Sequence, residues 1–145
     1  MEFTTDTGVE VKINPANFAL ADKLRKQVVR ELKNINIDIP EKSLKNKPKS
    51  EIINVIINSL LTLDASDELQ SIIFQCLTNC TYNREKIIYD TFEDMDARGY
   101  YYQIIGGCLQ VNLTPFFKNL FAELSEFTSK ISSFLKSKSM KNLRS

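Results

Sequence analysis

The chain has 145 residues, with 19 lysines and arginines against 18 aspartates and glutamates, and it contains no histidine. This length predicts one domain, and a net charge of +1 disfavours a protein whose task is to grip nucleic acid, because that task requires a basic excess. Without histidine the chain lacks the usual general base and the commonest metal ligand. We therefore expect no enzymatic activity, no cofactor and no bound metal.

The ends and the apolar stretches give no sign of secretion or of membrane insertion. Residues 1–6 contain neither a basic region nor an apolar region of the kind that a secretory signal needs. The most apolar stretch, residues 52–63, is interrupted by polar side chains and is too short to span a bilayer. We therefore expect an intracellular protein without a membrane partner, in which the three cysteines are reduced thiols.

The N-terminal residues, about 1–13, predict a small β-hairpin. Val9, Val11 and Ile13 alternate with polar residues, and Gly8 permits a left-handed turn before them. A hairpin of this size is marginal alone, so helices must cover it. Residues 35–39 alternate isoleucines with polar side chains in the same way, which predicts a third short strand or an extended linker.

Four helices are expected between the hairpin and residue 113. The first begins at Asn14-Pro15, a pair that suits a cap and a first helical position, and runs to Lys33. Its inward stripe consists of Phe18, Ala21, Leu24, Val28 and Leu32. A lysine-rich loop then precedes a nearly all-apolar helix over residues 50–63, which must be buried.

Ser66 is the expected N-cap of the third helix, which carries an apolar stripe up to Cys80. After a polar connection over residues 83–94, the fourth helix is expected from Asp94 to Leu113. This helix contains Gly106-Gly107, which indicates the close approach of a neighbouring segment.

The C-terminal part of the chain carries an apolar seam at heptad spacing, which is the pattern by which one helix docks along another. The seam residues are Phe117, Leu120, Leu124, Phe127, Ile131 and Phe134. They are either part of the domain's own core or a surface for a helical partner. The last ten residues, 136–145, are basic and contain no acid, and we expect them to be a disordered tail.

Three groups of residues are candidate sites of chemistry. Cys76 and Cys80, four residues apart, could form half of a metal site, but core thiols are the simpler interpretation because too few ligands complete the set. Tyr100-Tyr101-Tyr102 could stack on bases, but no basic stripe accompanies it. Acidic residues near the start of the fourth helix could bind a divalent cation, although acids are common at helix starts. These acids are Asp90, Glu93, Asp94 and Asp96.

Several segments, taken in order, resemble those of a known family. They are Val-Lys-Ile-Asn-Pro-Ala-Asn-Phe (11–18), Cys-Thr-Tyr-Asn (80–83), Lys-Ile (86–87), Asp-Thr-Phe-Glu (90–93) and Val-Asn-Leu-Thr-Pro-Phe-Phe-Lys (111–118). This series resembles the small phage and prophage proteins described as tail assembly chaperones. The lysine-rich loop and the basic tail have no counterpart in that resemblance.

The resemblance implies a role without catalysis. Such a protein coats the long, helical tape-measure protein of a phage tail, keeps it soluble, and hands it to the polymerising tube subunits. It acts in the host cytoplasm and is absent from the finished virion. The family carries no defined site residues over to this chain, so the proposal that the C-terminal seam is the tape-measure docking surface comes from its spacing alone.

We therefore expect a mainly α protein of about five helices in a compact bundle with a small N-terminal hairpin. A single domain would cover residues 1–135. Its expected partner is the tape-measure protein, with the tube subunit and a second copy of the chain as further candidates. The alternatives are a structural virion component, such as a tail or head–tail joining subunit, and a small enzyme with a carboxylate site.

Overall fold

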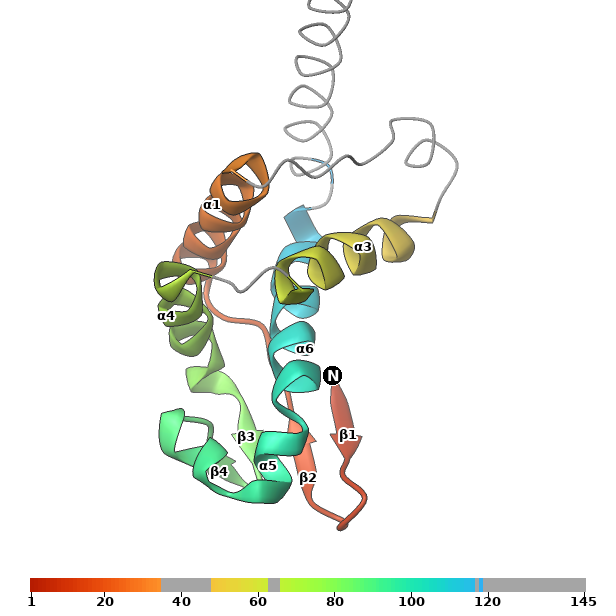
Figure 1. The fold of residues 1–145 in the computed structure, drawn as a ribbon, viewed down its shortest axis with the longest axis vertical. Coiled ribbons are helices and arrows are strands. Elements are labelled where there is room, and N and C mark those ends of the chain that lie inside the picture. The colour runs from red at the N-terminus through yellow and green to blue at the C-terminus, as the bar shows by residue number, and fades with distance from the viewer. Residues whose placement is uncertain (35–47, 63–65, 117, 119–145) are drawn as a thin grey trace, which may run out of the picture.

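The protein is mainly helical, as the sequence predicts, with a small sheet at one end (Figure 1). The structure is a computed structural model, and it describes residues 1–34, 48–62, 66–116 and 118. Its longer helices are α1 (Phe18–Asn34), α3 (Lys49–Thr62), α4 (Asp67–Cys76) and α6 (Tyr101–Leu113). α1 packs on α4 and α6, and α3 packs on α6, so α6 lies at the centre of the helical layer.

The core fills the space between these helices and the sheet. Its fully buried side chains come from every long element, so one continuous apolar cluster joins the sheet to the helices. The largest of these side chains include Ile13, Leu24, Ile53, Ile56, Leu69, Ile73, Leu77, Ile104 and Leu109. Each helix in the described part of the chain is too short or too polar to traverse a lipid bilayer.

The predicted N-terminal hairpin is confirmed. β1 (Glu2–Thr4) pairs antiparallel with β2 (Glu10–Lys12), and Phe3 lies opposite Val11. Gly8 has a φ of +87°, a backbone conformation that favours glycine, and its amide donates a 2.9 Å hydrogen bond to the carbonyl of Thr5. The hairpin therefore turns where the sequence indicated.

A second hairpin extends this sheet, in a region that the sequence analysis took as a helix end and a polar connection. β3 (Thr81–Tyr82) pairs with β2 and with β4 (Glu85–Lys86), giving the strand order β1-β2-β3-β4. Asn83 and Arg84 form its turn with φ values of +53° and +66°, the backbone of a two-residue hairpin turn. The turn escaped prediction because it contains no glycine.

The first helix begins later than predicted. α1 starts at Phe18, and the side chain of Asn17 accepts a 2.9 Å hydrogen bond from the amide of Leu20. Asn17 thus takes the capping role that was assigned to Asn14, because the amide of Ala16 is bonded elsewhere. The prediction that Phe18 faces inward was also wrong, since this ring is 74% exposed.

The third helix begins where the sequence predicts, whereas the fourth is divided in two. Ser66 caps α4 as predicted, accepting a 3.1 Å hydrogen bond from the amide of Leu69. The expected helix 94–113 is divided at Tyr100 into α5 (Met95–Gly99) and α6. The backbone of Tyr100 leaves the helical conformation, with φ −103° and ψ 9°, and its hydroxyl accepts a 2.8 Å hydrogen bond from the amide of Asp6, in the turn of the N-terminal hairpin.

Two short segments complete the described chain around α6. A 3₁₀ segment, η2 (Tyr89–Glu93), connects β4 to α5, and η3 (Thr114–Phe116) follows α6. The expected strand over 35–39, most of the lysine-rich loop, the helix over 117–134 and the tail 136–145 lie outside the described residues.

Candidate functional site

The predicted docking seam cannot be placed in the structure. Its residues, Phe117, Leu120, Leu124, Phe127, Ile131 and Phe134, all lie outside the described residues. The seam therefore stays a prediction. The candidate site described below is built from other side chains, which the structure does place.

Three of the five segments that carry the family resemblance are joined by hydrogen bonds at a place we call the junction. Asn112 on α6 is only 2% exposed, and its carbonyl oxygen accepts a 2.8 Å hydrogen bond from the amide of Ala16. The Asn112 amide group donates to the carbonyl of Cys108 at 2.8 Å. Asn14 donates to the carbonyl of Asn79 at 2.9 Å. The junction thus joins residues 14–16, 79–80 and 108–112 by specific hydrogen bonds.

The cysteines belong to the interior, and contact with the Cys108 thiol lowers the pKa of Cys76. All three are buried, and the Cys80 thiol donates to the carbonyl of Asn14 at 3.6 Å. Burial raises the pKa of Cys80, and contact with the Cys76 thiol together with burial raises the pKa of Cys108. Protonated, buried thiols are weak nucleophiles and poor metal ligands. The interpretation of these residues as core thiols fits this geometry.

Three of the acidic residues near α5 make two separate sets of contacts. Asp94 and Asp96 both accept a hydrogen bond from the hydroxyl of Tyr82, on β3. Glu93 forms an ion pair with Arg98, whose side chain also donates to the carbonyl of Phe92. Within the described residues, no three acids or cysteines come together in a way that would hold a metal ion.

The phenol of Tyr82 is held in its neutral form by this arrangement. The side chain is buried, with 8% exposed, and burial is the first cause that raises its pKa. The two neighbouring carboxylates raise it further, since a phenolate beside them would be repelled. Tyr82 therefore acts as a donor that fixes the start of α5 against the sheet.

The outstanding surface feature is a continuous row of aromatic rings, which we call the aromatic row. The ring of Tyr89 stacks on Phe74 with a centroid distance of 3.9 Å and an interplanar angle of 17°. Phe92 meets Phe74 edge to face at 5.9 Å. Phe92 also meets Tyr101 at 5.0 Å, and Tyr101 meets Tyr102 at 5.5 Å. The row thus crosses from η2 over α4 to the start of α6.

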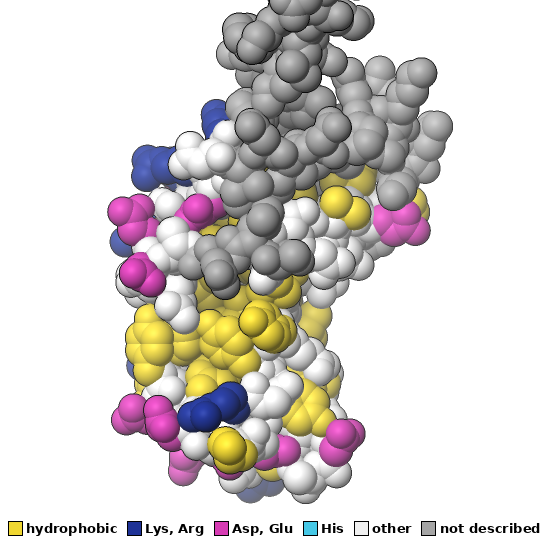
Figure 2. Space-filling view, in the orientation of Figure 1, with side chains coloured by type: hydrophobic (Ala, Val, Ile, Leu, Met, Phe, Trp, Pro, Cys, Tyr) yellow, Lys and Arg dark blue, Asp and Glu magenta, His cyan; other side chains and the backbone are white. Residues whose placement is uncertain are grey.

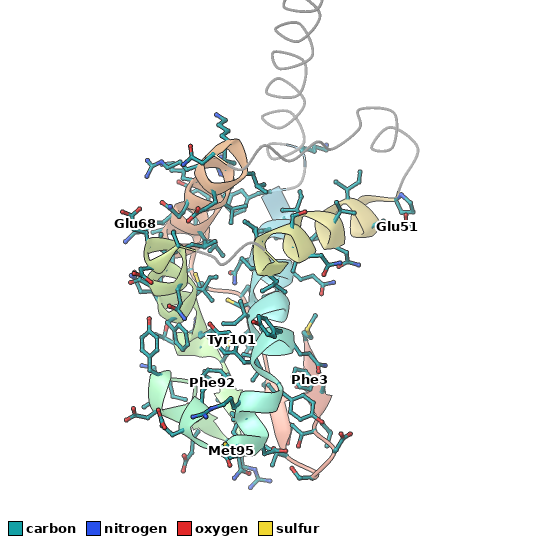
Figure 3. The ribbon with its side chains drawn as sticks, in the orientation of Figure 1. Phe3, Glu51, Glu68, Phe92, Met95 and Tyr101 are labelled. Carbon is teal, nitrogen blue, oxygen red and sulfur yellow. The ribbon has the colours of Figure 1, made fainter. Side chains whose placement is uncertain are left out.

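The two ends of the aromatic row are open to solvent, although its middle is packed. Phe74 and Phe92 are buried, whereas Tyr89 is 57% exposed and Tyr102 is 65% exposed. The Tyr101 hydroxyl accepts a 3.0 Å hydrogen bond from the side chain of Gln70, which fixes this ring. Figure 3 places Phe92 and Tyr101 close together, with Phe3 on the other side of α6. Rigid rings with exposed edges are typical anchors for a protein partner.

A hollow lies beside each end of the aromatic row. The hollow at the Tyr102 end has a volume of about 140 Å³, and the one at the Tyr89 end has about 300 Å³. The first is lined by Leu60, Leu61, Gln70, Ile73, Tyr101, Tyr102 and Ile105. The second is lined by Ser71, Phe74, Gln75, Thr78, Lys86, Ile87, Ile88 and Tyr89.

Together the row and its two hollows form one apolar surface, which we call the aromatic face. Figure 2 shows apolar side chains gathered there, below α3 and beside α4. Ile88, which is 50% exposed, extends the apolar surface at the Tyr89 end. The aromatic face is chemically suited to receive apolar side chains from a partner.

The sequence indicates only part of this face. The run Tyr100-Tyr101-Tyr102 was singled out, but as a surface for bases, whereas Tyr89 and Ile88 fell in a segment taken as a polar connection. The run Ile87-Ile88-Tyr89 was the available signal, because three consecutive apolar residues next to a strand cannot all face the core. Ile87 is buried and the next two residues are exposed.

No family model, curated protein or solved structure matches this chain. A functional proposal must therefore stand on the aromatic face and on the resemblance of the sequence segments.

Proposed function

We propose that the protein is a phage tail assembly chaperone that binds the helical tape-measure protein and shields its apolar surface. The observation that supports this proposal is the aromatic row, whose two exposed ends, Tyr89 and Tyr102, each lie beside a hollow. The resemblance of the sequence segments supplies the identity of the partner. The aromatic face supplies a means of binding.

The geometry of the face suits an amphipathic helix. Two hollows separated by a packed row can each receive one apolar side chain from the same partner, while the buried rings between them resist deformation. Aromatic rings that are already fixed lose little conformational entropy on binding. Tyr101, held by Gln70, and Phe74, stacked under Tyr89, are fixed in this way.

Shielding of this kind must be reversible, because the tape-measure protein is later transferred to the tube subunits. A small face with two anchors favours moderate affinity, and its phenol groups remain compatible with water after release. The predicted seam over residues 117–134 would add a second apolar surface for the same partner. A chaperone with two such surfaces could cover more than one turn of a long helix.

The proposal is tested by co-expression with the long, helix-rich protein that the neighbouring downstream gene is expected to encode. The tape-measure protein should be recovered in soluble form with the wild-type chain. The double variant Tyr89→Ala/Tyr102→Ala should reduce that recovery by about tenfold, since truncated anchors cost most of a small interface. Met95→Ala is the matched control, because Met95 is 75% exposed but lies outside the aromatic face. Equal recovery with all three chains would contradict the use of the face.

The seam needs its own test. Phe127→Ser should abolish co-purification with the tape-measure protein while leaving the circular dichroism spectrum unchanged. Loss of the folded spectrum would instead mean that the seam belongs to the core. Mass spectrometry of purified particles then separates a chaperone, which is missing from the virion, from a structural subunit, which is abundant.

A further inference from the structure

We propose that the aromatic face is covered, in the absence of a partner, by the C-terminal segment of the same chain, residues 117–145. This inference goes beyond the proposed function, and it rests on that function only for the identity of the protein that displaces the segment. It means that the chain keeps its own two apolar surfaces, the aromatic face and the predicted seam, against each other until a partner arrives.

The first argument is the uneven distribution of charge along the chain. Residues 117–145 contain six basic and two acidic residues, a net charge of +4, whereas residues 1–116 contain thirteen basic and sixteen acidic residues, a net charge of −3. The near-neutral total therefore hides a basic segment attached to an acidic body. Opposite charges of this size favour association of the two parts at moderate ionic strength.

The second argument is where the acidic residues lie. Residues 84–98, at the Tyr89 end of the face, carry five acids against three basic residues. Glu85, Asp90 and Asp94 among them are exposed, and Glu93 is paired with Arg98. Arg84 and Lys86 are exposed basic residues in the same stretch. Figure 2 shows acidic side chains along the lower edge of the apolar region. The apolar surface thus ends in a border of net negative charge, which we call the acidic border, although Lys86 lines the hollow at this end.

The third argument is the match in order and length. The segment begins at the C-terminal end of α6, next to Phe116, with its apolar seam first and its four basic residues from Lys136 to Arg144 last. A helix over 117–134 would be about 27 Å long, and α6 from Leu113 back to Tyr101 spans about 18 Å. A segment running back along α6 would therefore bring its seam to the aromatic row and its basic end to the acidic border.

The other exposed aromatic corner is less suitable for this segment. The ring centroids of Phe18 and Phe116 lie 6.1 Å apart, but Cζ of the Arg25 guanidinium lies 5.8 Å from the centroid of the Phe116 ring. The exposed side of α1 adds Lys23 and Arg30, and also Lys26, which forms an ion pair with Asp22 as Arg25 does. A basic segment would be repelled along α1, whereas it is attracted at the acidic border of the aromatic face.

Hydrogen exchange of the full chain tests the proposal. An isolated helix of this composition gains little from propensity, so slow exchange of the amides of residues 119–134 requires docking. We expect slow exchange in the wild-type chain and exchange about tenfold faster in Tyr89→Ala/Tyr102→Ala, because both anchors are lost. Met95→Ala should exchange as the wild type does. Fast exchange in the wild-type chain, or no effect of the double variant, would overturn the proposal.

Reversal of charge provides a second variant that does not touch the apolar contacts. Lys136→Glu/Lys138→Glu/Lys141→Glu should speed the exchange of residues 119–134, and adding Glu85→Lys/Asp90→Lys should restore the slow rate. The substitutions in the aromatic variants and in the charge reversals all lie at exposed residues or in the tail. The exchange of the α6 amides therefore serves as the folding control. A charge reversal without effect, or without rescue, would show that the border does not hold the segment.

The remaining outcomes distinguish the occupant and the two proposals. If slow exchange depends on protein concentration, a second copy supplies the segment, and the assignment to the same chain is wrong. If exchange behaves as expected but the tape-measure protein is not kept soluble, the self-docking stands and the chaperone function fails. If the tape-measure protein binds but residues 119–134 exchange fast without it, the chaperone function stands and the self-docking fails.

Discussion

The junction and the aromatic face are both rich in the residues that the sequence singles out, but they are built in opposite ways. The junction turns its polar groups inward, as when buried Asn112 binds the amide of Ala16 at 2.8 Å. The aromatic face leaves large rings partly outside, as with Tyr89 and Tyr102. Residues with satisfied, buried hydrogen bonds hold a fold together, whereas exposed rings beside hollows leave apolar area for a partner.

Three of the segments that resemble the tail chaperones, residues 11–18, 80–83 and 111–118, contribute to the stability of the fold through the junction. Asn14, Asn112 and Cys80 connect the hairpin region, α4 and α6, and none of them faces the hollows. The aromatic face draws on the other segments of the series, which supply Phe92, Lys86 and Ile87, and on stretches outside it, which supply Tyr89 and Tyr102. Variants in the junction should therefore affect folding first, and variants in the face should affect binding first.

The largest effect is expected in the junction. Asn112→Ala should lower the free energy of unfolding by about 3 kcal/mol, because it leaves the amide of Ala16 without its buried partner and opens a small cavity. Asn14→Ala is the control, since its hydrogen bond to the carbonyl of Asn79 is exposed and its loss should cost less than about 1 kcal/mol. Urea unfolding measures both. Equal losses would remove the distinction between buried and exposed members of the junction.

The second-largest effect on stability is expected at the close contact between α6 and the hairpin, as the difference between two glycine variants. A Cβ added at Gly107 would lie 2.6 Å from Ile13 Cδ1 and 2.9 Å from Met1 Sδ, and because the Ile13 side chain is fully buried, Gly107→Ala should destabilise the fold by about 1 kcal/mol despite the gain in helix propensity. A Cβ at Gly106 meets its nearest neighbours at ordinary distances of 3.6 and 3.7 Å. Gly106→Ala should therefore stabilise α6 by up to about 1 kcal/mol through helix propensity. Thermal unfolding that shifts both variants in the same direction would contradict this packing.

A smaller effect concerns Tyr82 and alkaline pH. Tyr82→Phe removes the hydrogen bonds to Asp94 and Asp96 and should cost about 1.5 kcal/mol at neutral pH. The folded protein raises the pKa of Tyr82, so the unfolded chain loses this proton first. The stabilisation that Tyr82 contributes should therefore be fully present below about pH 10 and be lost as pH rises above it. Urea unfolding at several pH values should show a flatter alkaline decline for Tyr82→Phe; identical slopes would refute the link.

The smallest effect on folding is expected at the aromatic face. Tyr102→Ala should change the free energy of unfolding by less than about 0.5 kcal/mol, because this side chain is 65% exposed. Tyr89→Ala should cost about 1 kcal/mol, since it also loses the stacked contact with Phe74. Urea unfolding tests both. A loss above 3 kcal/mol at either position would mean that the face is part of the core and not a surface for binding.

The sequence predicted those elements whose signals are local. Ser66 at the start of α4 and Gly8 in the N-terminal turn act within a few residues, and both were identified. The hairpin β3–β4 was missed because its Asn83-Arg84 turn lacks glycine and its two-residue strands depend on pairing with β2. Pairing between distant segments leaves little trace in a single sequence.

The aromatic face could not be predicted for a related reason. It combines Phe74 with Phe92 and Tyr101, which come from three elements, and no spacing rule links them. The sequence instead directed attention to the regular seam over residues 117–134, which stays a prediction. Regular spacing reveals surfaces that lie on one helix, whereas a surface assembled from several elements requires the fold.

The most direct test of the central claim, that the aromatic face contacts the tape-measure protein, is site-specific photocrosslinking in the full chain. A benzophenone amino acid at position 102, and separately at position 95, is activated during co-expression with the tape-measure protein. The account predicts a crosslink to that protein from position 102 and none from position 95. A crosslink from position 95 alone, or from neither position while the two proteins still co-purify, would contradict it.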